Sequence, residues 1–299
     1  MAAARAEFVR VARSFWLIPE IIPAARRDDV GLLHAFCRLV DDAADEGAGG
    51  APELERLEAE VTGRAPPRAL VERLRPRLAE MGLSTEPLEL LIAGVRSDLA
   101  PVRVPDDDAL VRYCYQVSST VGLMLCAALG VSAEGWDRAV DLGIALQLSD
   151  ILADVADDAA RDRVYLPAAR LARKGLSPGD MLAGVDPGDP RLAAVLAGIA
   201  ALADRYYASA REGMRWVPLR YRHGVLLLAE VWSAHGRASP AARRTGGFVA
   251  LGAGAKAAAL LRVVGRALTP GVLGVRPPAP RDPALHRALP GWPGTAGAA

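Results

Sequence analysis

The chain has 299 residues, of which 52% are hydrophobic and 24% are charged, and its formal net charge is +1. This length can bury a large core, and a net charge so close to zero excludes a general polyanion-binding protein, so we expect no nucleic-acid partner. The three cysteines lack metal-ligand spacing, and residues 1–10 show no signal-peptide pattern, so we expect a cytoplasmic protein.

Apolar residues recur at helical rather than alternating spacing along nearly the whole chain, which predicts an all-α protein. The expected helices cover residues 4–18, 24–46, 52–62, 68–81, 86–99, 107–130, 134–163, 178–184, 190–215, 218–236 and 247–268. We therefore expect one domain over residues 1–268. From residue 269 the chain is rich in proline and glycine with little periodicity, which predicts a mobile tail over 269–299.

Two of these helices carry a stripe of polar and acidic residues near their carboxyl ends. The stripes are Arg38, Asp41 and Asp45 in the first helix, and Gln147, Asp150, Asp154 and Asp158 in the second. Spacings of three and four residues place each stripe on one helix face. Acids there oppose the helix dipole at a cost of about 0.3–1 kcal/mol each when exposed, so stability does not explain them.

A solvated helix face is the alternative explanation for any run of charges. It suits Asp106, Asp107 and Asp108, because these follow a proline and begin a helix, where acids and N-caps are favoured. For the two stripes we favour a ligand. Oxygen donors alone suit a hard cation such as Mg²⁺, or Mn²⁺ in its place, so the sequence predicts a metal-bound diphosphate.

A basic stretch follows Glu230, because no acidic residue occurs between it and Asp282. Its members are Arg237, Arg243, Arg244, Lys256, Arg262, Arg266, Arg276 and Arg281. They could bind a diphosphate, contact an anionic membrane surface peripherally, or balance acids elsewhere in the fold. The segment from Gly252 to Ala257 fits the dinucleotide pattern GxGxxA, but no strand precedes it and no acid follows at the required distance, so we expect no nicotinamide site.

The histidines show no spacing typical of a metal site or a catalytic triad. We expect His34 to lie on a buried helix face, and His223, His235 and His286 to lie at the surface.

Three segments of the chain together resemble a known family. They are AFCRLVDDAADE, YCYQVSSTVGLM and ALQLSDILADVADDAARDRVYLP, and they resemble, in that order, the signature blocks of the squalene and phytoene synthases. The resemblance runs from about Ser14 to Leu268, and the motif sequences are most similar to those of the phytoene synthases. The resemblance implies a single all-α isoprenoid synthase bundle around a deep apolar cavity, with the two Asp-rich helices on opposite walls of its mouth.

The resemblance also implies a role for each matching residue. Asp41 and Asp45 would hold Mg²⁺ on one wall, and Asp150, Asp154 and Asp158 on the other. Tyr113 would line the reaction centre. Contacts to the prenyl diphosphate substrates are implied for Arg38, Gln147, Arg163 and Tyr165, and for Ser14 and Phe15 in a block that closes over the substrate.

The implied reaction joins two prenyl diphosphates head to head. Two geranylgeranyl diphosphates would give phytoene through a cyclopropylcarbinyl diphosphate, without a nicotinamide. Ionisation of an allylic diphosphate leaves a strongly negative group and a carbocation, so metal at the mouth and a dry apolar cavity suit the chemistry. Alternatives are a farnesyl diphosphate enzyme that makes presqualene diphosphate or squalene, and a degenerate member that serves as a binding or assembly factor. An EF-hand-like Ca²⁺ or Mg²⁺ module would need loop ligands, whereas these acids lie on expected helices.

The chain departs from the family pattern at four places. Asp150 stands where the family usually has asparagine, and Ala153 replaces an arginine. Trp232 occupies a late tyrosine position near the cavity, and Ser118-Ser119 replace the usual Ala-Gly. These changes allow an altered chain length, an altered product or a loss of activity.

Overall fold

A computed structural model describes residues 24–45, 47–237, 261–263, 265, 269, 272 and 277–295. It is built from helices, as the sequence predicts. The longer ones are α2 (Ala24–Asp45), α3 (Ala51–Val61), α4 (Ala69–Glu80), α5 (Glu86–Ser97), α6 (Asp107–Cys114), α7 (Thr120–Ala128), α8 (Trp136–Ala159), α11 (Pro190–Glu212) and α12 (Leu219–Arg237). Short helical pieces are η1 (Gly47–Gly50), the π turn η2 (Tyr115–Ser119), η3 (Ala133–Gly135), α9 (Ala168–Ala172), α10 (Pro178–Leu182), η4 (Gly213–Trp216) and η6 (Pro283–His286). The expected helix 4–18 and most of 247–268 lie outside the described residues.

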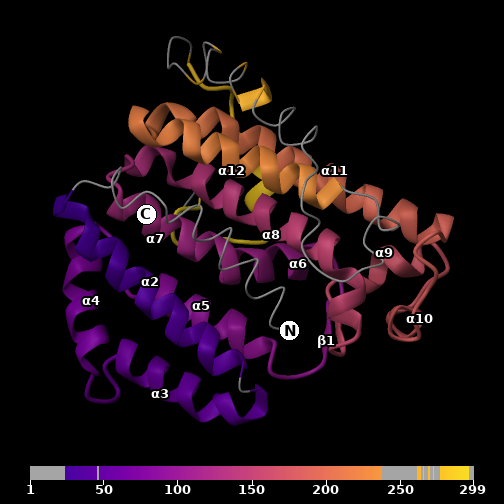
Figure 1. Ribbon diagram of the computed structural model, residues 1–299, viewed down its shortest axis with the longest axis horizontal. Helices are drawn as coiled ribbons and strands as arrows, with labels where there is room; N and C mark the ends of the chain where they lie inside the picture. Colours follow the sequence, from indigo (N-terminus) through magenta and orange to yellow (C-terminus); the bar gives the residue numbers. More distant parts are fainter. Residues whose placement is uncertain are drawn as a thin grey trace.

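The helices form two layers that meet at α7 and η2 (Figure 1). In one layer α2 packs on α4, α5 and α7, around a core that includes Phe36, Leu54 and Leu88. In the other, α8 packs on α11 and α12, around a core that includes Ile144 and Tyr207. The two acidic stripes therefore come from different layers.

Local sequence signals explain where several helices begin. The Asp106 carboxylate accepts a hydrogen bond from the Ala109 amide at 2.8 Å and caps α6, which confirms the structural interpretation of that acidic run. Ser177 and Asp180 form a reciprocal capping box at α10. Asp189 caps α11, whose first residue is Pro190.

A pair of two-residue strands was not predicted. β1 (Val102–Arg103) and β2 (Arg163–Val164) pair in parallel, with Val102 opposite Arg163. The pairing joins the segment after α5 to the segment after α8, which are about 60 residues apart in sequence. It holds the RVYLP segment beside the carboxyl end of α5.

The end of the chain differs from the predicted mobile tail. Residues 277–295 pack against the bundle, and Leu285, Ala288 and Leu289 belong to the same buried cluster as Tyr115 and Ile144. Apolar side chains in a proline-rich segment show no helical period, so their burial left no periodic signal in the sequence.

Within the described ranges, no helix is long and apolar enough to cross a membrane. The basic stretch includes three described arginines that each pair with an acid: Arg237 with Asp204, Arg262 with Glu230 and Arg281 with Asp141. These pairs support the charge-balance interpretation for those three residues, and the remaining members lie outside the described residues.

The histidine predictions are mostly wrong. His34 is exposed, whereas His235 and His286 are buried at 3% and 6% exposure. His223 is exposed, as expected. The His286 ring lies 3.1 Å from the Asp141 carboxylate, and a partner so distant in sequence cannot be recognised from the local pattern around a histidine.

Candidate active site

The acidic stripe on α8 lies on one helix face, as its spacing predicts, and the helix is kinked within it. Asp154 has non-helical backbone angles (φ −110°, ψ 16°), so α8 bends at the middle carboxylate of the stripe. Burial raises the pKa of Asp150 to about 8, and the negative charge of Asp154 raises it further. Burial and the same neighbour raise the pKa of Asp158 to about 7. Carboxylates in this arrangement repel one another, and a cation between them would relieve the repulsion.

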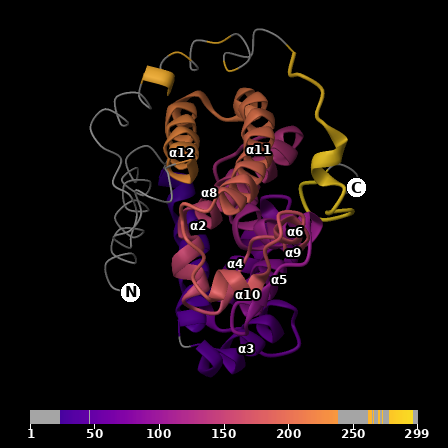
Figure 2. The ribbon, with the colours of Figure 1, turned by 90° about the vertical axis from the view of Figure 1, so that its right-hand side faces the viewer.

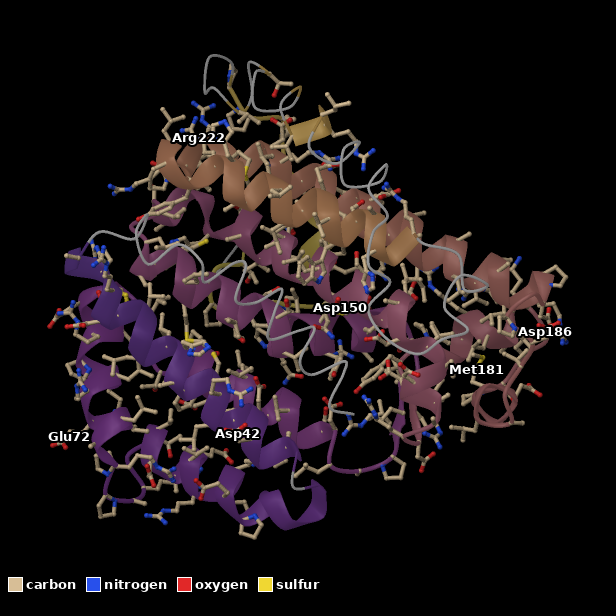
Figure 3. All side chains as sticks on the ribbon, in the orientation of Figure 1. Asp42, Glu72, Asp150, Met181, Asp186 and Arg222 are labelled. Carbon is tan, nitrogen blue, oxygen red and sulfur yellow. The ribbon has the colours of Figure 1, made fainter. Side chains whose placement is uncertain are left out.

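The stripe on α2 lies at the carboxyl end of that helix. Asp41 is exposed, and its charge adds to burial in raising the pKa of the Cys37 thiol to about 12. Arg38, expected to bind diphosphate, forms an ion pair of 2.7 Å with Asp42. Asp45 is the last residue of α2, but its side chain is outside the described part of the structure. Figure 3 shows Asp42 on α2 and Asp150 on α8, on helices of different layers.

Tyr113 and Tyr165 meet in the structure and share one carboxylate. Their rings stack with centroids 4.7 Å apart. The Tyr113 hydroxyl donates to Asp98 Oδ2 at 2.8 Å, and the Tyr165 hydroxyl donates to Asp98 Oδ1 at 2.7 Å. The two hydroxyls are 3.1 Å apart. The structure thus brings the two tyrosines together at Asp98, and their catalytic role stays a prediction.

Asp98 is a functional candidate that sequence reasoning missed. It is the C-cap residue of α5, so its carboxylate lies at the negative end of a helix dipole. Burial raises its pKa, and the hydrogen bonds from Tyr165 and Tyr113 oppose that shift. The same signal that singled out the stripes, an acid at a helix carboxyl end, could have identified it.

Arg163 connects this cluster to the α8 stripe. Its guanidinium donates to the Asp98 carbonyl oxygen at 2.8 Å, and its positive charge lowers the pKa of Asp158 against the effect of burial. A small crevice beside it is lined by Asp158, Arg163 and Tyr165, with Ile151 and Met181 among its apolar walls. The crevice thus combines a carboxylate, a guanidinium and a phenol. The deep apolar cavity implied by the resemblance stays a prediction.

Two of the departures from the family pattern contact each other. The Trp232 side chain on α12 hydrogen-bonds to the Asp150 carboxyl, and this bond lowers a pKa that burial has raised. An indole N–H can only donate, so it pairs with a carboxyl oxygen. Ala153 lies half-buried one residue before Asp154.

The serine pair lies in the π turn η2. The Ser119 hydroxyl is buried and donates to the Val140 carbonyl oxygen of α8 at 2.8 Å. A Cβ added at Gly143 would lie 2.5 Å from the Ser119 Cα, so η2 and α8 are in close backbone contact. The serines therefore add a polar contact between this π turn and α8.

The structure describes only some of the remaining expected site residues. Gln147 lies on α8, half-buried, one turn before Asp150. Ser14 and Phe15 are outside the described residues. Across the described ranges, no group of three or more His, Cys, Asp or Glu side chains is arranged to hold a metal ion. The oxygen-only donor set and the mutual repulsion on α8 still fit Mg²⁺ if diphosphate oxygens and waters supply further ligands.

Residues 8–248 match the family model of squalene/phytoene synthases. A phytoene synthase of Thermus thermophilus is 41% identical over 192 residues, which cover 62% of this chain and 65% of that protein. A 15-cis-phytoene synthase of Enterobacter agglomerans is 32% identical over 74% of this chain and 79% of its own length. A presqualene diphosphate synthase of Rhodopseudomonas palustris is 32% identical over 71% and 78% of the two chains. The chain thus spans just under two thirds of the Thermus relative.

Solved structures share the fold. A dehydrosqualene synthase aligns with a TM-score of 0.69 at 23% identity, over 88% of this chain and 94% of its own. The squalene synthase HpnC of Alicyclobacillus acidocaldarius aligns with a TM-score of 0.66 at 25% identity, over 78% and 88% of the two chains. The helical bundle described here is therefore an isoprenoid synthase fold.

Proposed function

Because this chain belongs to the squalene/phytoene synthase family, we propose that it joins two prenyl diphosphates head to head. The preferred substrates are two molecules of geranylgeranyl diphosphate and the preferred product is phytoene, since relatives carrying that name match the chain at 41% and 32% identity. Synthesis of phytoene needs no nicotinamide, in contrast to the reductive route to squalene.

One observation supports this function above the others: a hydrogen-bonded pair of tyrosines lies beside an acidic helix face. Asp158 and Arg163 line one crevice with Tyr165, and Tyr165 stacks on Tyr113. The reaction needs a negatively charged leaving group to depart and a cation to persist in its presence. Arg163 can bind the leaving diphosphate, and the electron-rich faces of the two aromatic rings can stabilise positive charge nearby.

Mg²⁺ is proposed as the metal, with Mn²⁺ as a substitute. Asp41 and Asp45 on α2 would hold it on one wall, and Asp150, Asp154 and Asp158 on the other. When bound, the metal would neutralise charge on the diphosphate and so ease its departure. The raised pKa values of Asp150 and Asp158 are those of carboxyls in need of a counter-cation.

The remaining chemistry is assigned to the chain's own residues. Departure of the first diphosphate takes the C–O bonding electrons, and the double bond of the second substrate attacks the resulting cation. Loss of a proton closes the cyclopropane ring. After a second ionisation and rearrangement, loss of another proton gives the hydrocarbon. Tyr113 and Tyr165 are held by Asp98 at the edge of this centre, where they can orient the reacting chains and pass a proton through their hydroxyls to the Asp98 carboxylate.

The test is to incubate the purified protein with Mg²⁺ and either geranylgeranyl or farnesyl diphosphate, with and without NADPH, and to identify the extracted hydrocarbons. Phytoene from the C20 substrate is the expected result. No product and no diphosphate release from either substrate would overturn the proposal and favour a binding or assembly role.

The matched variants are Asp154→Asn, in the α8 stripe, and Asp157→Asn, its exposed neighbour outside the stripe. We expect the first to abolish turnover with an unchanged circular dichroism spectrum, and the second to stay near wild type. Wild-type activity in Asp154→Asn would contradict the metal assignment.

Use of farnesyl diphosphate is the second candidate. The observation that favours it is the similarity to a presqualene diphosphate synthase at 32% identity over 71% of the chain. A C30 product, or presqualene diphosphate in the absence of NADPH, would select this function over phytoene synthesis.

Peripheral contact with a membrane is proposed for α12. Leu219 and Leu227 are 65% and 41% exposed, and Arg220 beside them is also exposed. Exposed leucines next to a basic residue suit the surface of an anionic bilayer. Co-sedimentation with phosphatidylglycerol vesicles should exceed that with phosphatidylcholine vesicles and should fall in Leu219→Glu/Leu227→Glu. Equal sedimentation with both vesicle types, for the wild type and the double variant alike, would contradict the proposed membrane contact.

A further inference from the structure

Residues 281–295, here called the brace, lie beyond the part of the chain that matches the family model, which ends at residue 248. Figure 2 shows this segment at the right, descending along the side of the bundle past α11. It adds side chains to the core cluster that also contains Tyr115, and Tyr113 packs against that cluster. The brace is therefore continuous with the core behind the candidate active site.

The first anchor of the brace is a buried ionic cluster on α8. Asp141 is fully buried and receives two hydrogen bonds from the Arg281 guanidinium, at 2.8 and 3.0 Å. His286 Nε2 lies 3.1 Å from the same carboxylate. Burial opposes ionisation of Asp141, but the contacts with His286 and Arg281 lower its pKa. A charged cluster this far from water fixes the segment at one position along α8.

The second anchor is on α11. The Tyr206 hydroxyl is buried and donates to the Leu285 carbonyl oxygen at 2.6 Å. Leu289, which follows Leu285 in the brace, is fully buried. These contacts carry the brace from α8 and α11 towards η2.

The third anchor reaches the π turn itself. Trp292 packs on Tyr115, with ring centroids 4.8 Å apart at an angle of 54°. The Tyr115 hydroxyl donates to the Pro293 carbonyl oxygen at 2.7 Å. Gly294 then adopts a positive φ of 69°, and a Cβ there would lie 3.0 Å from Leu123. This close approach seats the end of the brace against α7.

Tyr115 is the first residue of η2, and Tyr113 is two residues before it. A π turn has a wider hydrogen-bond spacing than an α-helix and is commonly found at functional sites. From these contacts we propose that the brace fixes η2 and thereby positions Tyr113, with Trp292 as the positioning residue. This inference rests on the proposed function only for its kinetic consequence.

The test compares variants of the full chain. Trp292→Ala removes the ring that packs on Tyr115, and Trp292→Phe keeps an aromatic ring there. Tyr115→Phe removes only the hydroxyl bonded to Pro293, so it tests the contact even if Trp292→Ala folds poorly. Trp216→Ala is the matched control, because Trp216 packs at Gly135, away from η2. Hydrogen exchange of residues 114–120, read by mass spectrometry, needs no substrate.

We expect Trp292→Ala to speed exchange in residues 114–120 at least tenfold, and Tyr115→Phe to speed it less. Both should leave exchange in α3 unchanged. We expect kcat to fall about tenfold in Trp292→Ala with KM within twofold, because the acids proposed to hold the metal for the diphosphate are on α2 and α8. Trp292→Phe should restore most of kcat. Unchanged exchange in residues 114–120, or the same changes in Trp216→Ala, would overturn the inference. An inactive wild type with faster exchange in Trp292→Ala would overturn the proposed function but not the brace.

Discussion

Asp98 accepts hydrogen bonds from two phenol hydroxyls at once, so one carboxylate determines where both Tyr113 and Tyr165 point. A half-buried carboxylate that accepts two phenol hydrogen bonds depends on those bonds for its stability. Loss of either side of the arrangement should therefore disturb the other.

Asp98→Asn should reduce kcat about 10- to 100-fold, because the amide N–H₂ group cannot accept the second phenol hydrogen bond and one tyrosine must move. Steady-state kinetics with the preferred prenyl diphosphate is the measurement. Tyr165→Phe is the matched control, since it keeps the ring stack and removes one donor, and it should cost less than Asp98→Asn. Wild-type kcat in Asp98→Asn would show that the carboxylate has no part in catalysis.

The raised pKa values of Asp150 and Asp158 predict how the metal-free protein responds to pH. Both carboxyls have an unfolded pKa near 3.8 and folded values of about 8 and about 7. At pH values between the unfolded and folded pKa, the folded state binds more protons than the unfolded state. The free energy of unfolding therefore falls as pH rises from about 4 to about 8.

The measurement is the Tm of EDTA-treated protein at about pH 6 and about pH 8.5, and we expect the lower Tm at the higher pH. Mg²⁺ with pyrophosphate should raise Tm more at the higher pH, where both carboxyls are ionised. Asp150→Asn is the control and should show a smaller pH dependence. An identical dependence in that variant would mean that Asp150 keeps an ordinary pKa.

At the scale of elements, η2 and α8 approach so closely that only glycine fits at the crossing. A Cβ at Gly143 would lie 2.5 Å from the Ser119 Cα and 2.8 Å from its backbone nitrogen. Gly143→Ala should therefore push the two elements apart and destabilise the protein by about 1–3 kcal/mol. Gly31→Ala in α2 is the control: among the described residues no atom lies within 4 Å of a Cβ there, so the better helix former should stabilise by up to about 1 kcal/mol. Urea denaturation measures the free energy of unfolding of both variants. Equal changes in the two would contradict the close contact between η2 and α8.

The described helices were largely predictable, because most follow an apolar period and several are bounded by proline or glycine. The expected ranges 86–99 and 190–215 compare with Glu86–Ser97 and Pro190–Glu212. The strand pair was not predictable, since two residues per strand are too short to show a period of two. The π turn η2 was not predicted, and the range 107–130 was expected to be one continuous helix, because the extra backbone residue leaves no mark in the pattern of apolar residues.

The acids of the candidate site were predictable in part for an energetic reason. Asp150, Asp154 and Asp158 stand where they cost helix stability, and that cost is visible in sequence. The contacts that join Tyr113 to Tyr165, and Trp232 to Asp150, cross between elements about 50 to 80 residues apart. No local pattern encodes such contacts, so only the fold could reveal them.

At the scale of the whole molecule, a largely buried ionic cluster joins the end of the chain to α8 in the middle of the sequence. Asp141 is fully buried between Arg281, His286 and Ser209, and Arg281 is only 9% exposed. The sequence predicted a mobile tail because this segment is rich in proline and glycine and has no apolar period. Its ionic partner Asp141 lies about 140 residues away, so no local pattern reveals the contact. The stability of the whole fold should therefore depend on this one carboxylate.

Asp141→Asn should lower the free energy of unfolding by about 3 kcal/mol, because Arg281, whose side chain is only 9% exposed, then keeps only the longer ion pair with Asp137 at 3.8 Å. Urea denaturation, with fluorescence of Trp292 and the other tryptophans, is the measurement. Arg287→Gln is the control, since its ion pair with Asp108 also ties the segment to the bundle but both partners are exposed, so the unfolding midpoint should hardly change. If the two variants lost the same stability, the buried charge would not be what holds the end of the chain, and apolar contacts such as those of Leu289 would carry that role.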